Sequence, residues 1–209
     1  MVDNPNYRKF LDEGIIKIIN EENINTALQN VRGRNVREGR VLIIVLYYTG
    51  GRPVEVLELR GSSITRDGGY VIIDIKAAKK GLPRKIYLQY NKPLVKELWE
   101  YSKLIHPDMY LFYHYRGNYK NSKMLKKEIK EYIETTAKLR YYFKKWFDGV
   151  VEGGINPYYL RHNRFSKMAE KNIPFEHIRL MKGSKSPGGV VPYIHMSSEM
   201  AKKNAKKID

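Results

Sequence analysis

Two arginines and one tyrosine stand in sequence contexts where they could act on a phosphate. Arg52 follows a glycine-rich turn and precedes Pro53, which suits the first turn of a helix. Arg161 lies early in a helix that Asn156-Pro157 opens. Helix starts favour anions, and a guanidinium can bond two oxygens of one anion. Tyr193 could supply a phenol nucleophile. Taken singly, each residue has a plainer interpretation: a surface arginine near a cap, or one of 17 tyrosines.

A basic loop offers candidates for proton transfer. Residues 69–76 and 84–90 alternate apolar and polar side chains and predict two strands of a hairpin, with residues 77–83 between them. Lys79 and Lys80 lie in that loop, and Lys76 lies just before it. A lysine whose pKa is lowered by neighbouring positive charge can donate a proton to a leaving oxygen. Solvated turn lysines are the plainer interpretation.

The charge balance indicates a polyanionic partner. Lysine and arginine total 39 against 22 aspartates and glutamates, which gives a net charge of +17 and a pI near 9.8. Such an excess is typical of nucleic-acid-binding proteins. An anionic membrane surface is the competing partner, and we disfavour it because the basic residues are spread along the chain and are not gathered on one amphipathic helix.

Composition also excludes several chemistries. The chain has no cysteine, so it has no disulfide, thiolate nucleophile or cysteine-ligated zinc. Its five histidines show no metal-ligand spacing, so we expect no metal. The longest apolar run, residues 41–48, is too short to span a bilayer, and the N-terminus is polar, which predicts a soluble, intracellular protein. Abundant lysine, isoleucine and tyrosine with scarce glutamine fit a thermophile.

Hydrophobic periodicity predicts a mainly α fold with a small antiparallel β-hairpin. We expect one domain, residues 1–209, in which residues 1–36 form an N-terminal helical layer, residues 37–195 a core and residues 196–209 a tail helix. The expected helices of the core are residues 36–48, 54–59, 93–103, 123–147, a segment that starts at 157, and 175–181.

The order of these motifs resembles the catalytic domain of the tyrosine recombinases, or lambda-integrase family, over about residues 37–200. Residues 49–60 look like the family's T-G-x-R-x-x-E-x-x-x-L box, and residues 155–162 resemble its H-x-L-R-H box. Residues 181–184, followed nine residues later by Tyr193, resemble its G-H box and nucleophile. The basic hairpin lies between the boxes in the place that the family expects.

The resemblance implies cleavage and rejoining of double-stranded DNA without metal, ATP or another cofactor. By that likeness, Tyr193 attacks the scissile phosphate and forms a 3′-phosphotyrosyl link, while Arg52 and Arg161 bind the phosphate oxygens. Lys79 is the expected general acid, with Lys76 and Lys80 as alternatives. Recombination would require four protomers on two duplexes, with DNA in the cytoplasm or nucleoid of a host cell as the target.

Two positions depart from the family pattern. Tyr158 stands where the H-x-x-R histidine is expected, and Ser184, or Lys185 after a one-residue slip, stands for the G-H histidine. A Y-x-x-R box is similar to that of some archaeal virus and plasmid integrases. The hydroxyls can bond a phosphate, but a phenol nucleophile has a pKa of about 10 and needs help to lose its proton. The sequence leaves that help unassigned.

Two supporting residues are predicted with alternatives. Glu55 lies three residues after Arg52 and is expected to orient it, and a plain surface glutamate is the other interpretation. His162 is expected to pack or to bind a phosphate more than to catalyse.

The sequence leaves two other functions open. One is cleavage and religation in the manner of a type IB topoisomerase, and the other is DNA binding by an inactive protein of the same fold. The family's N-terminal core-binding domain is expected to be absent, since about 36 residues precede the catalytic region.

Overall fold

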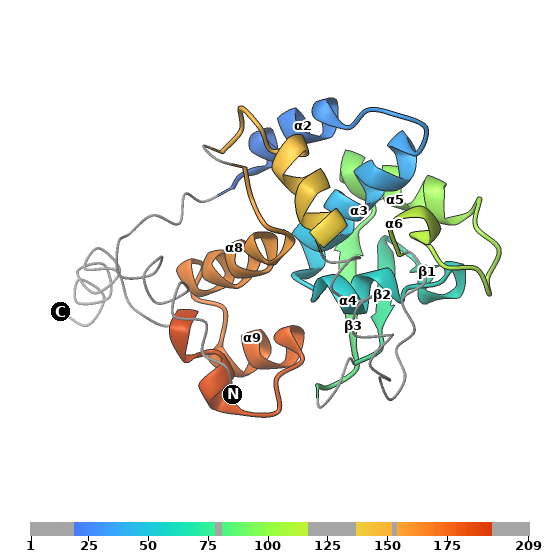
Figure 1. The fold of residues 1–209 in the computed structure, drawn as a ribbon. Helices are drawn as coiled ribbons and strands as arrows, with labels where there is room; N and C mark the ends of the chain where they lie inside the picture. Colours follow the sequence, from blue (N-terminus) through green and yellow to red (C-terminus); the bar gives the residue numbers. More distant parts are fainter. Residues whose placement is uncertain (1–18, 78–80, 117–136, 152–153, 194–209) are drawn as a thin grey trace, which may run out of the picture.

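The computed structural model describes residues 19–77, 81–116, 137–151 and 154–193 (Figure 1). The expected tail helix, residues 1–18 of the expected N-terminal helical layer and much of the expected helix 123–147 lie outside the described residues. The predicted fold class is confirmed: the described chain is mainly helical with one small antiparallel sheet.

Helix α3, Val36–Thr49, is the centre of the core. Its residues 41–46 are fully buried, as expected of a helix that is apolar nearly all round. Full burial of each such aliphatic side chain contributes roughly 1.5–3 kcal/mol. Helices α2 (Glu21–Asn30), α5 (Pro93–Ser102) and α8 (Pro157–Glu170) pack against α3. At its end, Gly50 adopts the left-handed conformation (φ 58°), which turns the chain toward Arg52.

The sheet has three strands, not the two that were predicted. Strands β1 (Ile64–Asp67), β2 (Tyr70–Ile75) and β3 (Arg84–Gln89) are antiparallel in that order, with Ile73 paired to Ile64 on one side and Ile86 on the other. Strand β1 escaped prediction because three of its four side chains are exposed, so it carries no hydrophobic alternation.

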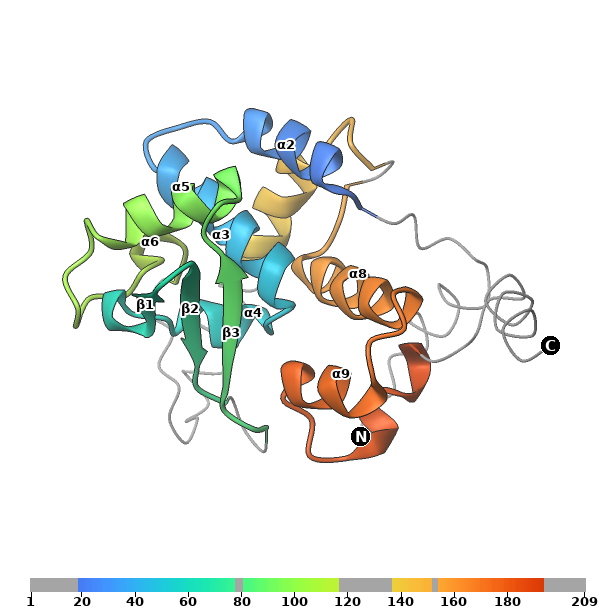
Figure 2. The same ribbon diagram turned by 180° about the vertical axis from the view of Figure 1, so that it is seen from behind.

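A C-terminal layer follows α8. Helix α9 (Phe175–Lys182) packs against α8, and two short 3₁₀ turns, Pro187–Gly189 and Val191–Tyr193, complete the described chain. An apolar cluster joins this layer to α8 and consists of Phe165, Met168, Ile178, Val190 and Tyr193. Seen from behind, α9 lies beside the β2–β3 hairpin (Figure 2), and the Leu82 N–H donates to the Gly183 carbonyl at 3.1 Å.

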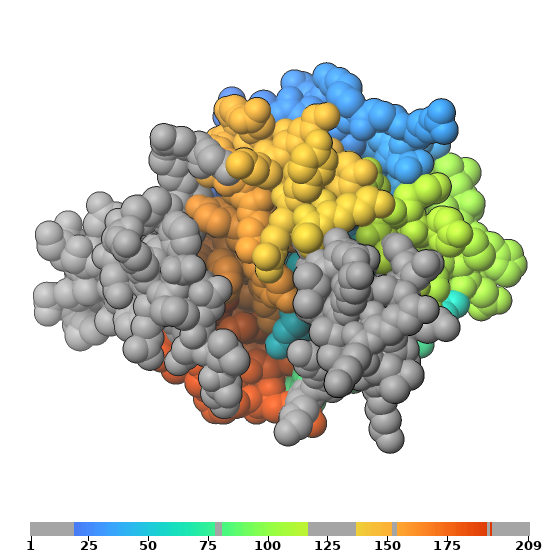
Figure 3. Space-filling model, viewed as in Figure 1, coloured from blue at the N-terminus to red at the C-terminus, as the bar shows by residue number. Residues whose placement is uncertain are grey.

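The remaining described elements are short. They are α4 (Pro53–Leu57), a 3₁₀ turn at Gly61–Ser63, α6 (Tyr113–Arg116) and the helical residues 137–146. In the space-filling view, teal residues of the segment after α3 meet the orange and red residues of the C-terminal layer (Figure 3). The segment that carries Arg52 and the helix that carries Arg161 lie side by side at this junction, as the hydrogen bond from Arg161 to the Gly50 carbonyl shows.

Candidate active site

Arg52 is held at the start of α4 by Glu55. The Glu55 carboxylate accepts one bond from the Arg52 backbone N–H (3.1 Å) and one from the Arg52 Nη1 (2.6 Å). The Arg52 side chain is 33% exposed, whereas that of Glu55 is fully buried. The predicted arrangement, in which Glu55 faces Arg52 across one helical turn, is therefore present in the structure. It leaves part of the guanidinium open to an anion.

A third arginine, Arg84 on β3, completes this cluster. Its Nη2 donates to Glu55 Oε2 at 2.7 Å, and its side chain is only 5% exposed. Burial alone would raise the pKa of Glu55, but the hydrogen bond and charge of Arg84, with the charge of Arg52, lower it below the ordinary value. The carboxylate is thus ionised and fixes two guanidiniums at once.

Sequence reasoning missed Arg84. The signal that could have found it is the alternation of β3, because Arg84 occupies the inward-facing positions together with Ile86 and Leu88. A charged residue on the buried face of a strand needs a partner. Arg84 also lies against Gly183, where an added Cβ would come within 2.7 Å of the Arg84 Nη1.

Arg161 links the two halves of the site. It lies one turn into α8, whose start is capped by the Asn156 side chain. Its Nη1 donates to the Gly50 carbonyl (2.6 Å) and its Nη2 to the Lys182 carbonyl (2.9 Å). Burial, followed by the charge of Arg52, lowers the pKa of Arg161 to about 10. The charge of Glu55 raises the pKa of Arg161 and offsets part of this lowering, and the group stays protonated at neutral pH.

Tyr193 lies inside the same site on the same chain. Tyr193 is buried, with 7% of its surface exposed, and its Oη lies 2.6 Å from the Nδ1 of His162. The two rings stack with centroids 5.8 Å apart and planes at 26°, and Phe165 makes an edge contact with the Tyr193 ring. His162, which was expected to pack or bind phosphate, contacts the candidate nucleophile itself.

The environment of His162 disfavours its charged form. Burial, followed by the positive charges of Arg161 and Lys182, lowers the pKa of His162 to about 4. At neutral pH the imidazole is therefore uncharged and one ring nitrogen is a proton acceptor.

Lys182 is a second residue that sequence reasoning missed. Its Nζ lies 4.7 Å from the centroid of the Tyr193 ring and donates to the Gly189 carbonyl. Burial, followed by the charges of Arg161 and Arg52, lowers the pKa of Lys182 to about 7. Its position directly before the Gly-Ser of the degenerate G-H box was the available signal, but that box directed attention to Ser184 and Lys185.

The two substituted positions lie at the ends of helices. Tyr158 is in the first turn of α8, with its backbone N–H bonded to the Asn156 side chain (2.8 Å). The Ser184 hydroxyl, which was expected to meet the phosphate, donates to the Ser186 carbonyl at 2.9 Å. The Lys185 carbonyl accepts from Arg179 at 3.2 Å, and the Lys185 side chain is exposed.

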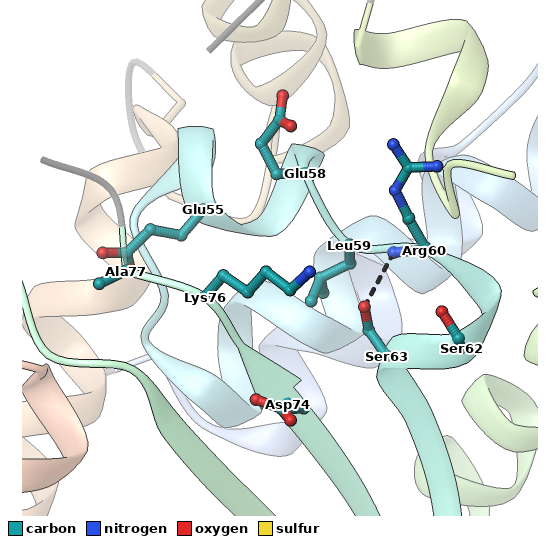
Figure 4. A pocket seen from close by; sticks show the side chains of 9 residues that line it. All are labelled: Glu55, Glu58, Leu59, Arg60, Ser62, Ser63, Asp74, Lys76 and Ala77. Atoms are coloured by element: carbon teal, nitrogen blue, oxygen red, sulfur yellow. Dashed lines mark hydrogen bonds between the residues drawn. The ribbon is translucent and has the colours of Figure 1, made fainter. Parts of the chain in front are cut away.

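Of the three candidate lysines at the hairpin, the structure describes only Lys76. Lys79 and Lys80 lie outside the described residues. Lys76 is exposed at the end of β2 and lines a cavity of about 260 Å³, where Figure 4 shows its side chain beside Leu59. Glu58, Arg60 and Asp74 share this cavity, so Lys76 there has mixed charge around it.

Two searches of the described residues concern metal ligands and membrane-spanning helices. Residues 19–77, 81–116, 137–151 and 154–193 contain no cluster of three histidine or carboxylate side chains that could hold a metal ion. Within the same ranges, no helix combines the length and apolar character needed to cross a bilayer.

Comparison with protein families identifies the class. Residues 17–200 match the model of the phage integrase family, which covers most of the chain. The chain therefore belongs to the phage integrase family, as its motifs predicted. A comparison with curated protein sequences gave no match.

Solved structures agree in fold. The XerH site-specific recombinase bound to a palindromic difH substrate has a TM-score of 0.63 at 20% identity, over 90% of this chain and 53% of that chain. XerA recombinase has a TM-score of 0.62 at 17% identity, over 90% and 61%. The Tn1549 transposon integrase, in complex with circular intermediate DNA, has a TM-score of 0.61 at 13% identity, over 93% and 67%. The chain thus spans about half to two thirds of these recombinase chains and has the fold of a tyrosine recombinase catalytic domain.

Proposed function

We propose that this chain is the catalytic domain of a site-specific DNA recombinase or integrase, with Tyr193 as its nucleophile. The observation that carries the proposal is the burial of Tyr193 beside two cations: the Lys182 Nζ lies 4.7 Å from its ring centroid, and Arg161 interacts with it electrostatically. A tyrosine in such surroundings suits attack on a phosphodiester, because the surrounding cations can stabilise the negative charge of the phosphate.

The two arginines of the motifs have complementary roles in this mechanism. Arg52 and Arg161 bind the non-bridging oxygens of the scissile phosphate and stabilise the charge that develops on them, a role that metal ions take in other nucleases. Glu55 occupies one edge of Arg52 and leaves the exposed edge for the phosphate. Lys182 adds a further cation, and the hydroxyls of Tyr158 and Ser184 are proposed to bond phosphate oxygens.

The covalent step conserves the energy of the phosphodiester. The Tyr193 Oη forms a bond to phosphorus as the bond from phosphorus to the 5′-oxygen breaks, which gives a 3′-phosphotyrosyl strand and a free 5′-hydroxyl. Lys79 is the proposed donor of the proton to the 5′-oxygen, with Lys76 and Lys80 as alternatives. Attack by a 5′-hydroxyl from another strand reverses the chemistry, so neither ATP nor a metal ion is required.

The proposed partner is double-stranded DNA, which the net charge of +17 favours electrostatically. The solved XerH and Tn1549 proteins are bound to DNA in the complexes that resemble this chain. Strand exchange between two duplexes would involve four protomers and take place in the cytoplasm and nucleoid of the host cell. Composition and the Y-x-x-R box support an origin in a thermophilic archaeal virus or plasmid.

A nicked DNA substrate tests the function directly. A nick beside the scissile bond lets the short cleaved strand diffuse away and traps the phosphotyrosyl protein. We expect a covalent adduct with the parent protein and none with Tyr193→Phe, while salt-sensitive DNA binding is the same for both. Absence of adduct in the parent would assign DNA binding alone. Adduct formation without exchange between duplexes would assign cleavage and religation of the topoisomerase type.

A further inference from the structure

The contact between His162 and Tyr193 addresses how the phenol loses its proton. The histidine positions of the family motifs are Tyr158 and Ser184 here, and neither side chain is a ready base at neutral pH. The His162 Nδ1 lies 2.6 Å from the Tyr193 Oη. We propose that His162 is a catalytic residue that accepts the Tyr193 proton during cleavage and returns it during rejoining. This inference rests on the proposed function of Tyr193 as the nucleophile.

The geometry holds the pair in one arrangement. The two rings stack at 26°, and Phe165 packs edge-on against Tyr193 at a centroid distance of 5.8 Å. His162 is adjacent to Arg161 on α8, so one helix presents both a ligand for the phosphate and an acceptor for the nucleophile's proton. Next to them, Asn163 exchanges two hydrogen bonds with the backbone of Ile19, which fixes this part of α8 against the start of the described chain.

Burial and the charges around His162 keep its imidazole unprotonated before DNA binds. A general base must be unprotonated before the reaction, and burial with the cations Arg161 and Lys182 keeps the His162 pKa far below 7. With a proton on Nε2, the Nδ1 lone pair accepts the hydrogen bond of the phenol. The same two cations would oppose the imidazolium that forms. The negative phosphodiester bound at Arg161 offsets that repulsion, so proton transfer is favoured once DNA is in place.

The proton balance of the step is complete. As the Tyr193 Oη bonds to phosphorus, its proton passes to the His162 Nδ1 and gives an imidazolium. The 5′-oxygen leaves with the electron pair of its bond to phosphorus and takes a proton from a lysine ammonium. In rejoining, the lysine recovers the proton of the attacking 5′-hydroxyl, and the imidazolium returns its proton to the departing Tyr193 oxygen.

The first test compares His162→Gln with the parent protein on the nicked substrate. Glutamine offers a hydrogen-bonding side chain but cannot take up a proton. We expect the rate of adduct formation to fall about 10²- to 10⁴-fold with DNA affinity unchanged, as for loss of a general base. His177→Gln is the matched control, since His177 is an exposed histidine on α9, and it should retain the parental rate. A His162→Gln variant that cleaves at the parental rate would overturn the proposal.

The second test separates proton transfer from positioning. A fluorinated tyrosine at position 193, whose phenol ionises at lower pH, should restore much of the rate lost in His162→Gln, because the phenol no longer needs an acceptor. Without such rescue, the role of His162 is structural and the proposal fails. A 5′-bridging phosphorothiolate substrate, whose leaving group needs no acid, should leave the His162→Gln defect in place. Rescue by this substrate would assign His162 to the leaving group and contradict the proposal.

A third measurement covers the case in which His162→Gln does not fold. In the protein with His162 intact, the fluorinated tyrosine should change the cleavage rate little, because the acceptor already assists ionisation. A rate that rises in proportion to the phenolate fraction would exclude His162 as the acceptor. Failure of the proposed function is distinct from all these outcomes, since the parent protein would then form no adduct at all.

Discussion

The two halves of the site handle positive charge in opposite ways. In the first, Arg52 and Arg84 share the buried carboxylate of Glu55 through bonds of 2.6 and 2.7 Å. In the second, Arg161 and Lys182 donate to backbone carbonyls, so their bonds bring them no negative charge. The pKa of Glu55 is lowered by its cations, whereas burial and neighbouring cations lower the pKa of Arg161, His162 and Lys182.

The two clusters therefore have different roles: the Glu55 cluster orients Arg52, and the Arg161 cluster is suited to bind a phosphate. The Glu55 carboxylate bonds both Arg52 and Arg84 before DNA arrives, so it can hold Arg52 in a fixed orientation without a substrate. In the second half, Arg161 and Lys182 donate to backbone carbonyls, and a bound phosphate would bring negative charge to the cluster of Arg161, His162 and Lys182. Its charges therefore cost stability in the free protein and favour the bound state, as expected where a functional site departs from the best packing.

Removal of the Glu55 charge should give the largest change in stability. Glu55→Gln leaves the buried Arg84 and the adjacent Arg52 without their carboxylate, and loss of one member of a buried ion pair typically costs about 3–5 kcal/mol. We expect a loss of that size in the free energy of unfolding, measured by urea denaturation, together with weaker cleavage because Arg52 is no longer oriented.

The matched control for Glu55→Gln is Glu100→Gln. Glu100 pairs with Lys103 at 2.7 Å, but both side chains are about half exposed. Loss of a surface pair changes stability by about 0–1 kcal/mol. If the two variants lost similar stability, the buried Glu55 carboxylate would not stabilise the fold more than a surface ion pair does.

Lys182→Met should raise the stability of the folded protein, in contrast to Glu55→Gln. The folded-state pKa of Lys182 is about 7, below its ordinary value of 10.5, so the unfolded chain binds the proton more tightly and folding stability rises with pH across that interval. Methionine has a similar length without the charge. We expect the free energy of unfolding of the variant to exceed that of the parent by about 1–2 kcal/mol at pH 6, after allowance for solvent screening. The difference should become progressively smaller toward pH 10.

The same Lys182→Met variant should cleave DNA more slowly, since it has lost a cation beside the nucleophile. Thermal or urea unfolding at several pH values, together with adduct formation on the nicked substrate, measures both effects. A variant that was less stable than the parent at pH 6 would show that Lys182 contributes to folding, and the contrast between the two halves would not hold.

The sequence predicted the parts of this site that local signals define. Asn156-Pro157 marked the start of α8, the glycines after α3 marked the Arg52 turn, and one-turn spacing placed Glu55 against Arg52. The ordered boxes also predicted the family and the fold class. These features depend on residues within about one turn of each other, where propensity and spacing are informative.

The rest of the site depends on contacts between distant segments. Arg84 reaches Glu55 from 29 residues away, and His162 reaches Tyr193 from 31 residues away. No spacing rule relates such positions, because the packing of β3 on α4, and of the last 3₁₀ turn on α8, brings them together. Strand β1 was not predicted for a related reason: its own sequence shows no hydrophobic alternation, and its pairing with β2 makes it a strand.

The last predicted effect is the loss of folding stability at acid pH that His162 causes. Its folded-state pKa of about 4 lies below its ordinary value of 6.5, so between these values the unfolded state binds the proton that the folded state excludes. Stability should therefore fall as the pH decreases from 6.5 to 4, by about 2–3 kcal/mol from this residue. Ionised carboxylates such as Glu55 add to the loss at lower pH, so the contribution of His162 is the difference between variants.

That difference can be measured with His162→Gln and His177→Gln. His162→Gln should have a flatter stability profile than the parent between pH 6.5 and 4, because glutamine does not titrate. His177→Gln changes an exposed histidine of α9, outside the buried cluster of Arg161, His162 and Lys182, and should keep the parental slope. Equal slopes for His162→Gln and the parent would mean that His162 is protonated as readily in the folded protein as in the unfolded chain. The imidazole beside Tyr193 would then be largely occupied by a proton near pH 6, and its use as the acceptor of the phenol proton would be confined to higher pH.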